Sequence, residues 1–294
     1  MPLRFMVTGR HGQLGSALIA SLSQYVPGCE ILALGREQLD LSKPGPIAAL
    51  VAEFKPDVIF NPAAWTAVDA AETATEPAAL VNAHAPARLA EAARSHGALL
   101  VHWSTDFVFN GVAPLTDAGL RRGWREDDPP DPLSVYGRTK LEGEQAVLAS
   151  GARALVLRTA WVWSHSGKCF PTAILARARS AGALRVVADQ EGSPTYATRL
   201  AEASIQASLA TLQEPGREGL YHLSGAGFTS WHGLAVATCE AAGLSVPITP
   251  IATLDWPTPA RRPAWSVLDC SQFESAFGHA LPPWHEDIAS VFHV

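Results

Sequence analysis

The sequence predicts an α/β fold in which a doubly wound parallel sheet is followed by a smaller C-terminal lobe. In the first half, short continuous apolar runs alternate with alanine-rich segments of helical length, which is typical of parallel strands covered by helices on both faces. After residue 165 this alternation becomes irregular. We therefore expect one domain over residues 1–165 and a lobe over residues 166–294, some segments of which could return to the main sheet.

The individual elements follow from this alternation in chain order. Continuous apolar runs predict strands over residues 3–9, 30–35, 57–64, 99–105 and 154–161. Helices are predicted between them, over residues 13–24, 44–54, 75–96 and 136–150. Further along, a turn-rich segment at 219–231 and a proline-rich segment at 256–265 interrupt the pattern and indicate the separate lobe.

Composition excludes several classes of protein. The chain has 294 residues, of which 48% are hydrophobic and 17% charged, and its net charge of -6 argues against a nucleic-acid backbone as partner. No apolar run reaches the roughly 18 residues of a membrane span, and the first strand begins too early for a signal peptide, so we expect a cytoplasmic protein. The 4 cysteines lie far apart, which predicts neither disulfides nor a zinc site.

A glycine-rich stretch directly follows the first predicted strand. It reads TGRHGQLG, so that Gly9, Gly12 and Gly15 have the spacing G-x-x-G-x-x-G around Gln13 and Leu14. Glycines between a strand and a helix let backbone N–H groups approach a pyrophosphate at the helix N-terminus. The stretch therefore predicts a Rossmann-like dinucleotide site; the alternative is a plain glycine-rich turn.

The end of the second predicted strand bears on the choice of cofactor. Dinucleotide folds often place an acidic residue there to hold the adenosine ribose, whereas this chain has Gly35 and Arg36. An arginine attracts a 2′-phosphate, so NADPH is favoured over NADH, unless Arg36 is merely a solvent-exposed side chain. Further residues expected along the cofactor path are Asp40, Leu41, Ala63, Ala64, Trp65, Thr66 and Trp103.

Polar residues that could perform chemistry follow the fourth predicted strand. Thr105 and Asp106 emerge at the carboxyl edge of the sheet, where ligands bind in open α/β folds. Tyr136 and Lys140 lie one turn apart at the start of the next helix. A phenol exchanges protons well only if a neighbouring cation stabilises its phenolate, so the pair predicts a catalytic couple rather than an ordinary surface pair.

Motifs spread over nearly the whole chain carry a family resemblance. They are GQLG, NPAAWTAVDAAE, STDFVFNG, VYGRTKLEGE, LRTAWVW and PTPARRP. The chain thereby resembles the dTDP-4-dehydrorhamnose reductases within the extended short-chain dehydrogenase/reductase family. The resemblance implies reduction of the C4 ketone of dTDP-4-dehydro-L-rhamnose to dTDP-L-rhamnose, the last step of dTDP-rhamnose biosynthesis for surface polysaccharide.

The resemblance also implies roles for individual residues. Tyr136 would donate a proton to the ketone oxygen while NADPH delivers hydride, and Lys140 would in addition bind the nicotinamide ribose. Thr105 would hold the substrate oxygen. Asp106 and Trp161 match positions that contact the sugar nucleotide, although Trp161 could equally be a core tryptophan.

The sequence departs from the family pattern at two places, and two other functions stay open. The segment 112–132 is longer than expected, and Ala17 stands where some members carry a magnesium-binding glutamate, so no metal is expected. A monomer or homodimer is expected. One rival is a reductase of another dTDP-4-keto-6-deoxysugar, and another is a non-catalytic subunit like the regulatory subunit of methionine adenosyltransferase.

Overall fold

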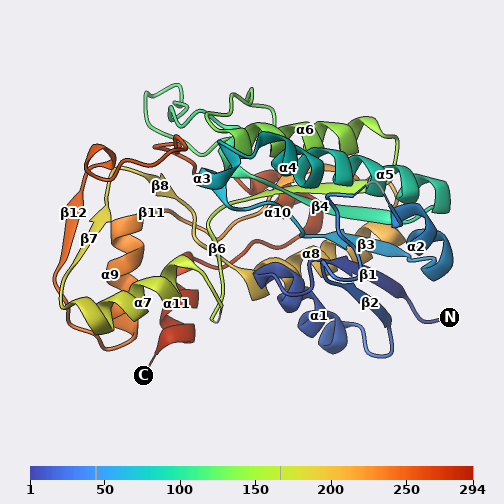
Figure 1. Ribbon diagram of the computed structural model, residues 1–294, viewed down its shortest axis with the longest axis horizontal. Coiled ribbons are helices and arrows are strands. Elements are labelled where there is room, and N and C mark those ends of the chain that lie inside the picture. The colour runs from blue at the N-terminus through green and yellow to red at the C-terminus, as the bar shows by residue number, and fades with distance from the viewer. Residues whose placement is uncertain (44, 166, 294) are drawn as a thin grey trace.

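The main body of the protein is a six-stranded parallel sheet (Figure 1). A computed structural model describes residues 1–43, 45–165 and 167–293. The strands, in their spatial order, are β10 (Gly219–His222), β5 (Ala154–Thr159), β4 (Leu99–Thr105), β3 (Val58–Asn61), β1 (Arg4–Thr8) and β2 (Glu30–Leu34).

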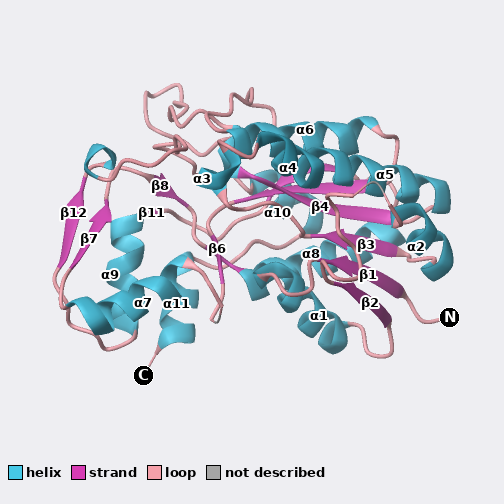
Figure 2. Ribbon diagram, viewed as in Figure 1, coloured by secondary structure: helices cyan, strands magenta, loops and turns pink. Residues whose placement is uncertain are grey.

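Helices cover both faces of this sheet (Figure 2). Helices α1 (Gln13–Tyr25) and α8 (Ala197–Gln213) pack on one face, and α2 (Ile47–Phe54), α5 (Ala85–His96) and α6 (Val135–Ala149) pack on the other. Strand β1 shows why its sequence is apolar throughout: Phe5 and Val7 enter the core on the first face, and Met6 enters the core on the second. The predicted doubly wound α/β fold is confirmed.

The predicted elements of the first half agree with the structure except at their ends. The apolar runs at 57–64 and 154–161 end as strands at Asn61 and Thr159, because the residues that follow turn away at the carboxyl edge. The helix predicted over 75–96 consists of α4 (Thr75–Ala79), a π-helical turn η1 (Leu80–His84) and α5. For the helix predicted over 44–54, position 44 lies outside the described residues.

The second half contributes to both parts of the molecule. Strand β10 and helices α8 and α10 (Ser271–Phe277) belong to the main sheet and its covering layers. The C-terminal lobe lies beside the sheet in Figure 1. Its elements are β6 (Val162–Trp163), α7 (Phe170–Ala181), β7 (Leu184–Val187), β8 (Glu191–Gly192), β9 (Thr195–Tyr196), β11 (Thr229–Ser230), α9 (Trp231–Ala241), β12 (Ile248–Ile251) and α11 (Trp284–Phe292).

The strand order determines where a ligand can bind. The chain runs from β1 outward to β2 and then returns to place β3 on the other side of β1. In open α/β sheets such a reversal leaves a crevice at the carboxyl ends of the two strands. None of the helices in the described part of the chain combines the length and the apolar character needed to cross a lipid bilayer.

Candidate active site

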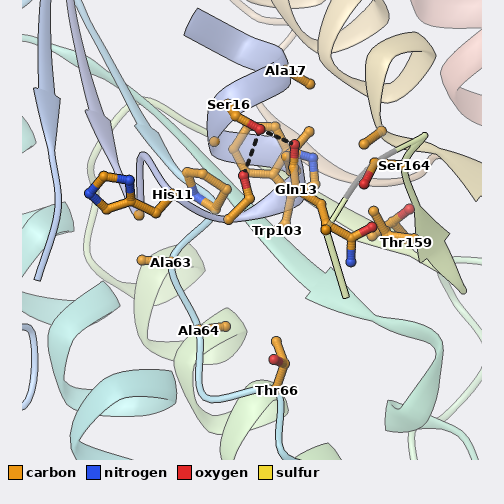
Figure 3. Close-up of a pocket in the computed structure, with 18 of the residues that line it drawn as sticks. His11, Gln13, Ser16, Ala17, Ala63, Ala64, Thr66, Trp103, Thr159 and Ser164 are labelled. Carbon is orange, nitrogen blue, oxygen red and sulfur yellow. Dashed lines mark hydrogen bonds between the residues drawn. The ribbon is translucent and has the colours of Figure 1, made fainter. Parts of the chain in front are cut away.

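A cavity of ≈ 1070 Å³ opens at the carboxyl edge of the sheet. Figure 3 shows residues from the start of α1, from the loop after β3 and from the end of β5 around this hollow. Most of the predicted cofactor-binding residues line it: Gly9, Gly12, Gln13, Leu14, Gly15, Arg36, Ala63, Ala64, Thr66 and Trp103. Tyr136 and Lys140 line the same cavity, so the glycine loop and the predicted catalytic couple face one space.

The glycine loop is shaped so that side chains cannot replace its glycines. Gly9 has a left-handed backbone with φ of 62°, and a Cβ there would stand 3.0 Å from the Cβ of Ala63. A Cβ on Gly15 would overlap the carbonyl of Gly9. Helix α1 begins next to this loop without an acidic residue in its first turn, so its free N–H groups are available to an anion. The cradle therefore fits a dinucleotide pyrophosphate.

The wall opposite the glycine loop is held by a residue that the sequence analysis missed. Buried Asn82, in the π-helical turn η1, accepts a hydrogen bond of 2.8 Å from the backbone N–H of Trp65 and donates one of 3.2 Å to the Trp65 carbonyl. It also donates to the hydroxyl of Thr139 in α6, at 3.2 Å. Asn82 thus joins the loop after β3 to the helix that carries Tyr136 and Lys140. Its only signal in the sequence is an asparagine within an alanine-rich helix.

Helix α6 places Tyr136 and Lys140 against the end of β4. The helix begins after Ser134, whose hydroxyl caps it by accepting a hydrogen bond of 3.1 Å from the N–H of Gly137. Lys140 is buried, and its Nζ donates a hydrogen bond of 2.5 Å to the carbonyl of Trp103. Desolvation lowers the pKa of Lys140 to about 8, against the opposing charge of Glu144.

Tyr136 is protonated at neutral pH in this setting, which is the form that a proton donor requires. Desolvation raises the pKa of Tyr136 to about 12; a hydrogen bond with Thr105 acts in the opposite direction, and the charge of Asp106 adds to the rise. The ring packs edge-on against Phe107, with centroids 5.6 Å apart. Loss of the phenolic proton therefore requires further stabilisation of the phenolate, which the Lys140 ammonium can supply.

Thr105 and Asp106 interact with Tyr136 but do not line the large cavity. The Thr105 hydroxyl donates a hydrogen bond of 3.0 Å to Asp106 Oδ1 and accepts one of 3.2 Å from the N–H of Phe107. Asp106 is buried; desolvation raises its pKa to about 7, against a hydrogen bond from Ser266 of the C-terminal lobe. These two residues therefore lie where Tyr136 and the lobe come together.

Trp161 is held in an unusual backbone conformation beside a second tryptophan. Its φ is 45°, a left-handed value that is rare for a bulky residue and costs of order 1–3 kcal/mol. The half-buried ring stacks on Trp231, with centroids 3.5 Å apart, and the absence of a side chain at Gly192 leaves room for it. Trp161 thus lies in an aromatic pair at the edge of the lobe, and the sequence analysis missed its partner.

Of the other predicted residues, Arg36 lines the cavity and the rest do not. Arg36 lines the cavity with 82% of its side chain exposed, and its Nε lies 3.7 Å from Asp40 Oδ2. Asp40 accepts hydrogen bonds from Ser42, and Leu41 is buried in the core between the sheet and α2. Four predicted residues besides Thr105 and Asp106 do not line the cavity: Asp40, Leu41, Trp65 and Trp161.

The segments NPAAWTAVDAAE and PTPARRP form a clasp between the main sheet and the lobe. Arg262, from PTPARRP, forms a bidentate ion pair with Asp69 of α3 (Val68–Ala71), at 2.8 and 3.0 Å. The Asp69 carboxylate also accepts a hydrogen bond of 3.2 Å from the N–H of Ala260. The side chains of Thr258 and Arg262 are themselves hydrogen-bonded at 2.7 Å. The clasp fixes the lobe over the carboxyl edge of the sheet.

The long segment 112–132 is fastened to the same lobe. Arg121 pairs with Glu191 of β8, and its guanidinium lies 4.2 Å from the ring centroid of Trp265. Trp124 stacks on Phe109 at 4.4 Å. Because Glu191 directly precedes Gly192, which contacts the Trp161 ring, this segment borders the tryptophan pair. Within the described ranges, no group of three or more His, Cys, Asp or Glu side chains is arranged to hold a metal ion.

Comparison with known proteins agrees with this arrangement. Residues 3–294 match the family model described as the RmlD substrate binding domain. A dTDP-4-dehydrorhamnose reductase of Burkholderia thailandensis is 40% identical, over 96% of this chain and 95% of its own. A probable dTDP-4,6-dihydroxy-2-methyloxan-3-one 4-ketoreductase of Streptomyces antibioticus is 38% identical, over 99% and 95%.

A solved structure extends the agreement to three dimensions. The dTDP-4-dehydrorhamnose reductase of Bacillus anthracis in complex with NADP has a TM-score of 0.91 and 30% identity, with 99% of each chain covered. The match spans both the main sheet and the lobe, so it covers the glycine loop, helix α6 and the tryptophan pair together. The chain therefore belongs to the family of the RmlD substrate binding domain and of the dTDP-4-dehydrorhamnose reductases.

Proposed function

We propose that the chain reduces the C4 ketone of dTDP-4-dehydro-L-rhamnose to dTDP-L-rhamnose, with NADPH as the favoured cofactor and NADH as an alternative. The observation that carries this proposal is that Tyr136 and Lys140 line the same cavity as the glycine cradle. The glycine loop and the N-terminus of α1 would hold the pyrophosphate of a dinucleotide, which would supply hydride, and the phenol of Tyr136 in the same cavity supplies the proton. The family membership and the NADP complex of the Bacillus anthracis relative support the same activity.

The chain's own residues account for the proton half of the reaction. Tyr136 donates its phenolic proton to the ketone oxygen as the C4 carbon is reduced, which leaves a phenolate. The Lys140 ammonium stabilises this phenolate, and its hydrogen bond to the Trp103 carbonyl holds it in place. Thr105 orients the tyrosine and the substrate oxygen. We assign substrate contacts to Asp106 and Trp161, and we assign the lobe segments after residue 165 to substrate binding.

A coupled assay tests this proposal. dTDP-glucose is converted by the upstream dehydratase and epimerase, the purified chain is added with NADPH, and the product sugar is identified by NMR. We expect dTDP-L-rhamnose together with stoichiometric NADPH oxidation. No NADPH oxidation with any keto-sugar would contradict an enzymatic role and favour the non-catalytic subunit.

A second candidate is reduction of another dTDP-4-keto-6-deoxysugar. It is favoured by the Streptomyces antibioticus relative, which is named as a probable 4-ketoreductase of dTDP-4,6-dihydroxy-2-methyloxan-3-one. The segment 112–132, fastened beside the tryptophan pair, gives this chain its own border to the sugar site. Comparing kcat/KM for several dTDP-4-keto-6-deoxysugars separates the two candidates. We place the enzyme in the cytoplasm as a monomer or homodimer.

A further inference from the structure

A carboxylate lies just beyond the end of β2, where the sequence predicted none. Glu37 lines the cavity just beyond the end of β2, and a Cβ on Gly35 would overlap its carboxyl group. The Glu37 carboxylate is therefore folded back into the space that a side chain at position 35 would fill. Position 35 is where dinucleotide folds often carry an acidic residue for the adenosine ribose. Two residues in this chain, a glycine and a glutamate, thus place a carboxylate there.

The glycine loop holds this carboxylate in position. Arg10 Nη2 donates a hydrogen bond of 2.6 Å to Glu37 Oε1, and His11 Nε2 lies 3.3 Å from the same oxygen. The backbone N–H of Arg10 donates to the carbonyl of Leu34 at 3.2 Å, which ties the loop to the end of β2. A hydrogen bond from its own backbone N–H, a hydrogen bond from His11 and the charge of Arg10 lower the pKa of Glu37 against the opposing effect of desolvation, so the carboxylate is ionised at neutral pH.

We propose that Glu37 is a specificity-determining residue of the cofactor site, which accepts hydrogen bonds from the adenosine ribose hydroxyls and opposes a 2′-phosphate. This inference rests on the proposed function. An ionised carboxylate accepts hydrogen bonds from a diol but repels a phosphate dianion. Arg36, which is highly exposed and lines the same cavity, would attract the phosphate. The cofactor preference of this chain is therefore set by two opposed charges, and NADH is a working cofactor beside NADPH.

The arrangement is more specific than an ordinary surface ion pair. An exposed arginine and glutamate can pair anywhere on a protein and contribute little to stability. Here the pair lies on the cavity lining, and the glutamate occupies space that only a glycine at position 35 leaves open. Gly35 is not among the residues with a left-handed backbone, so its lack of a side chain, rather than its flexibility, is what the structure uses.

Direct binding tests Glu37 without requiring catalysis. The probes are 2′,5′-ADP and 5′-AMP, which share the adenosine and differ by the 2′-phosphate, and their Kd values are measured by calorimetry. We expect Glu37→Gln to raise the preference for 2′,5′-ADP over 5′-AMP by about tenfold or more, the size of one charge-assisted hydrogen bond. Glu30→Gln is the matched control, because Glu30 lies at the far end of the same strand and pairs with Arg4. It should leave the preference unchanged.

A second variant tests the position of the carboxylate and not only its charge. Gly35→Ala adds a methyl group where the Glu37 carboxylate lies, so the carboxylate must move while its charge is kept. The preference should shift in the same direction as in Glu37→Gln, by a smaller factor. An unchanged preference in Glu37→Gln overturns the proposal, and a shift in Glu37→Gln without one in Gly35→Ala overturns the positional role of Gly35.

The same variants separate this inference from the proposed function. In the keto-sugar assay, Glu37→Gln should raise the ratio of kcat/KM with NADPH to that with NADH. If the parent chain reduces no keto-sugar while the nucleotide preference still responds to Glu37→Gln, only the proposed function fails. If the parent is active and the preference does not respond, only the role of Glu37 fails.

Discussion

The two ends of the candidate site are built by different means. At the phosphate end, the walls consist mostly of backbone and small residues that directly follow β1 and β3, such as Gly9, Gly15 and Ala63. At the other end of the site, beyond the cavity lining, side chains from distant segments meet, and Trp161 and Trp231 are one example. The first end depends on local spacing, whereas the second exists only after the lobe has docked. Damage to each end should therefore appear in a different kinetic constant.

The largest effect is expected from the point where the two ends meet. Tyr136→Phe removes the proton donor and keeps the ring packed against Phe107. We expect kcat to fall by a factor of about 10² or more, with little change in the Kd of the cofactor. Stopped-flow measurement of NADPH oxidation and calorimetric binding check both values. Near-normal turnover would remove Tyr136 from the mechanism.

Substitution of Lys140 should lower both turnover and cofactor affinity. Lys140→Ala removes the cation beside Tyr136 and the hydrogen bond to the Trp103 carbonyl, so turnover and cofactor affinity should both fall, by roughly tenfold or more each. Steady-state kinetics and cofactor titration measure the two effects. An Arg138→Ala variant is the control, because Arg138 is exposed on the same helix. If only one constant changes in Lys140→Ala, the two roles belong to different groups.

The pH dependence of the parent enzyme follows from the same lysine. Burial lowers the pKa of Lys140 to about 8, so the ammonium is present below pH 8 and is lost as the pH rises. We expect kcat/KM to fall above about pH 8, approaching roughly tenfold per pH unit. A pH–rate profile from pH 6 to pH 10 measures this limb. A flat profile through pH 9.5 would show that the Lys140 charge is not required.

A smaller and more selective effect is expected from the clasp. Arg262→Ala removes the bidentate pair with Asp69 and loosens the lobe over the sheet. KM for the keto-sugar should rise by about tenfold, while cofactor affinity stays close to that of the parent. The neighbouring Arg261→Ala is the matched control, since Arg261 is exposed. An equal loss of cofactor affinity would mean that the two ends are not separable.

The smallest effect is expected at the adenosine end. Arg36 is 82% exposed, so solvent screens its attraction for a 2′-phosphate. Arg36→Ala should lower the ratio of kcat/KM for NADPH to that for NADH by about three- to fivefold. Initial rates with the two cofactors under one salt concentration give this ratio. If the ratio does not fall, Arg36 does not contact the 2′-phosphate.

The same contrast between the two ends explains which site residues could be predicted from the sequence and which could not. Gly9, Gly12 and Gly15 were placed on the cavity because strand, loop and helix follow one another along the chain. The pair of Tyr136 and Lys140 was found because a helix brings residues four apart to one face. Trp231 was missed because its stacking on Trp161 joins positions far apart in sequence. Glu37 was missed because its side chain turns back over a glycine, a contact that no spacing rule contains.

Strand β10 limits how the substrate specificity of such an enzyme can be exchanged. The strand pairs with β5 but lies in the sequence between segments of the lobe, and α8 precedes it on the face shared with α1. A chimera joined once after β5 would replace part of the sheet and its core together with the sugar site. Grafting a new specificity requires several junctions that leave α8, β10 and α10 in place. In this fold, single substitutions in the lobe are thus the shorter route to a new sugar.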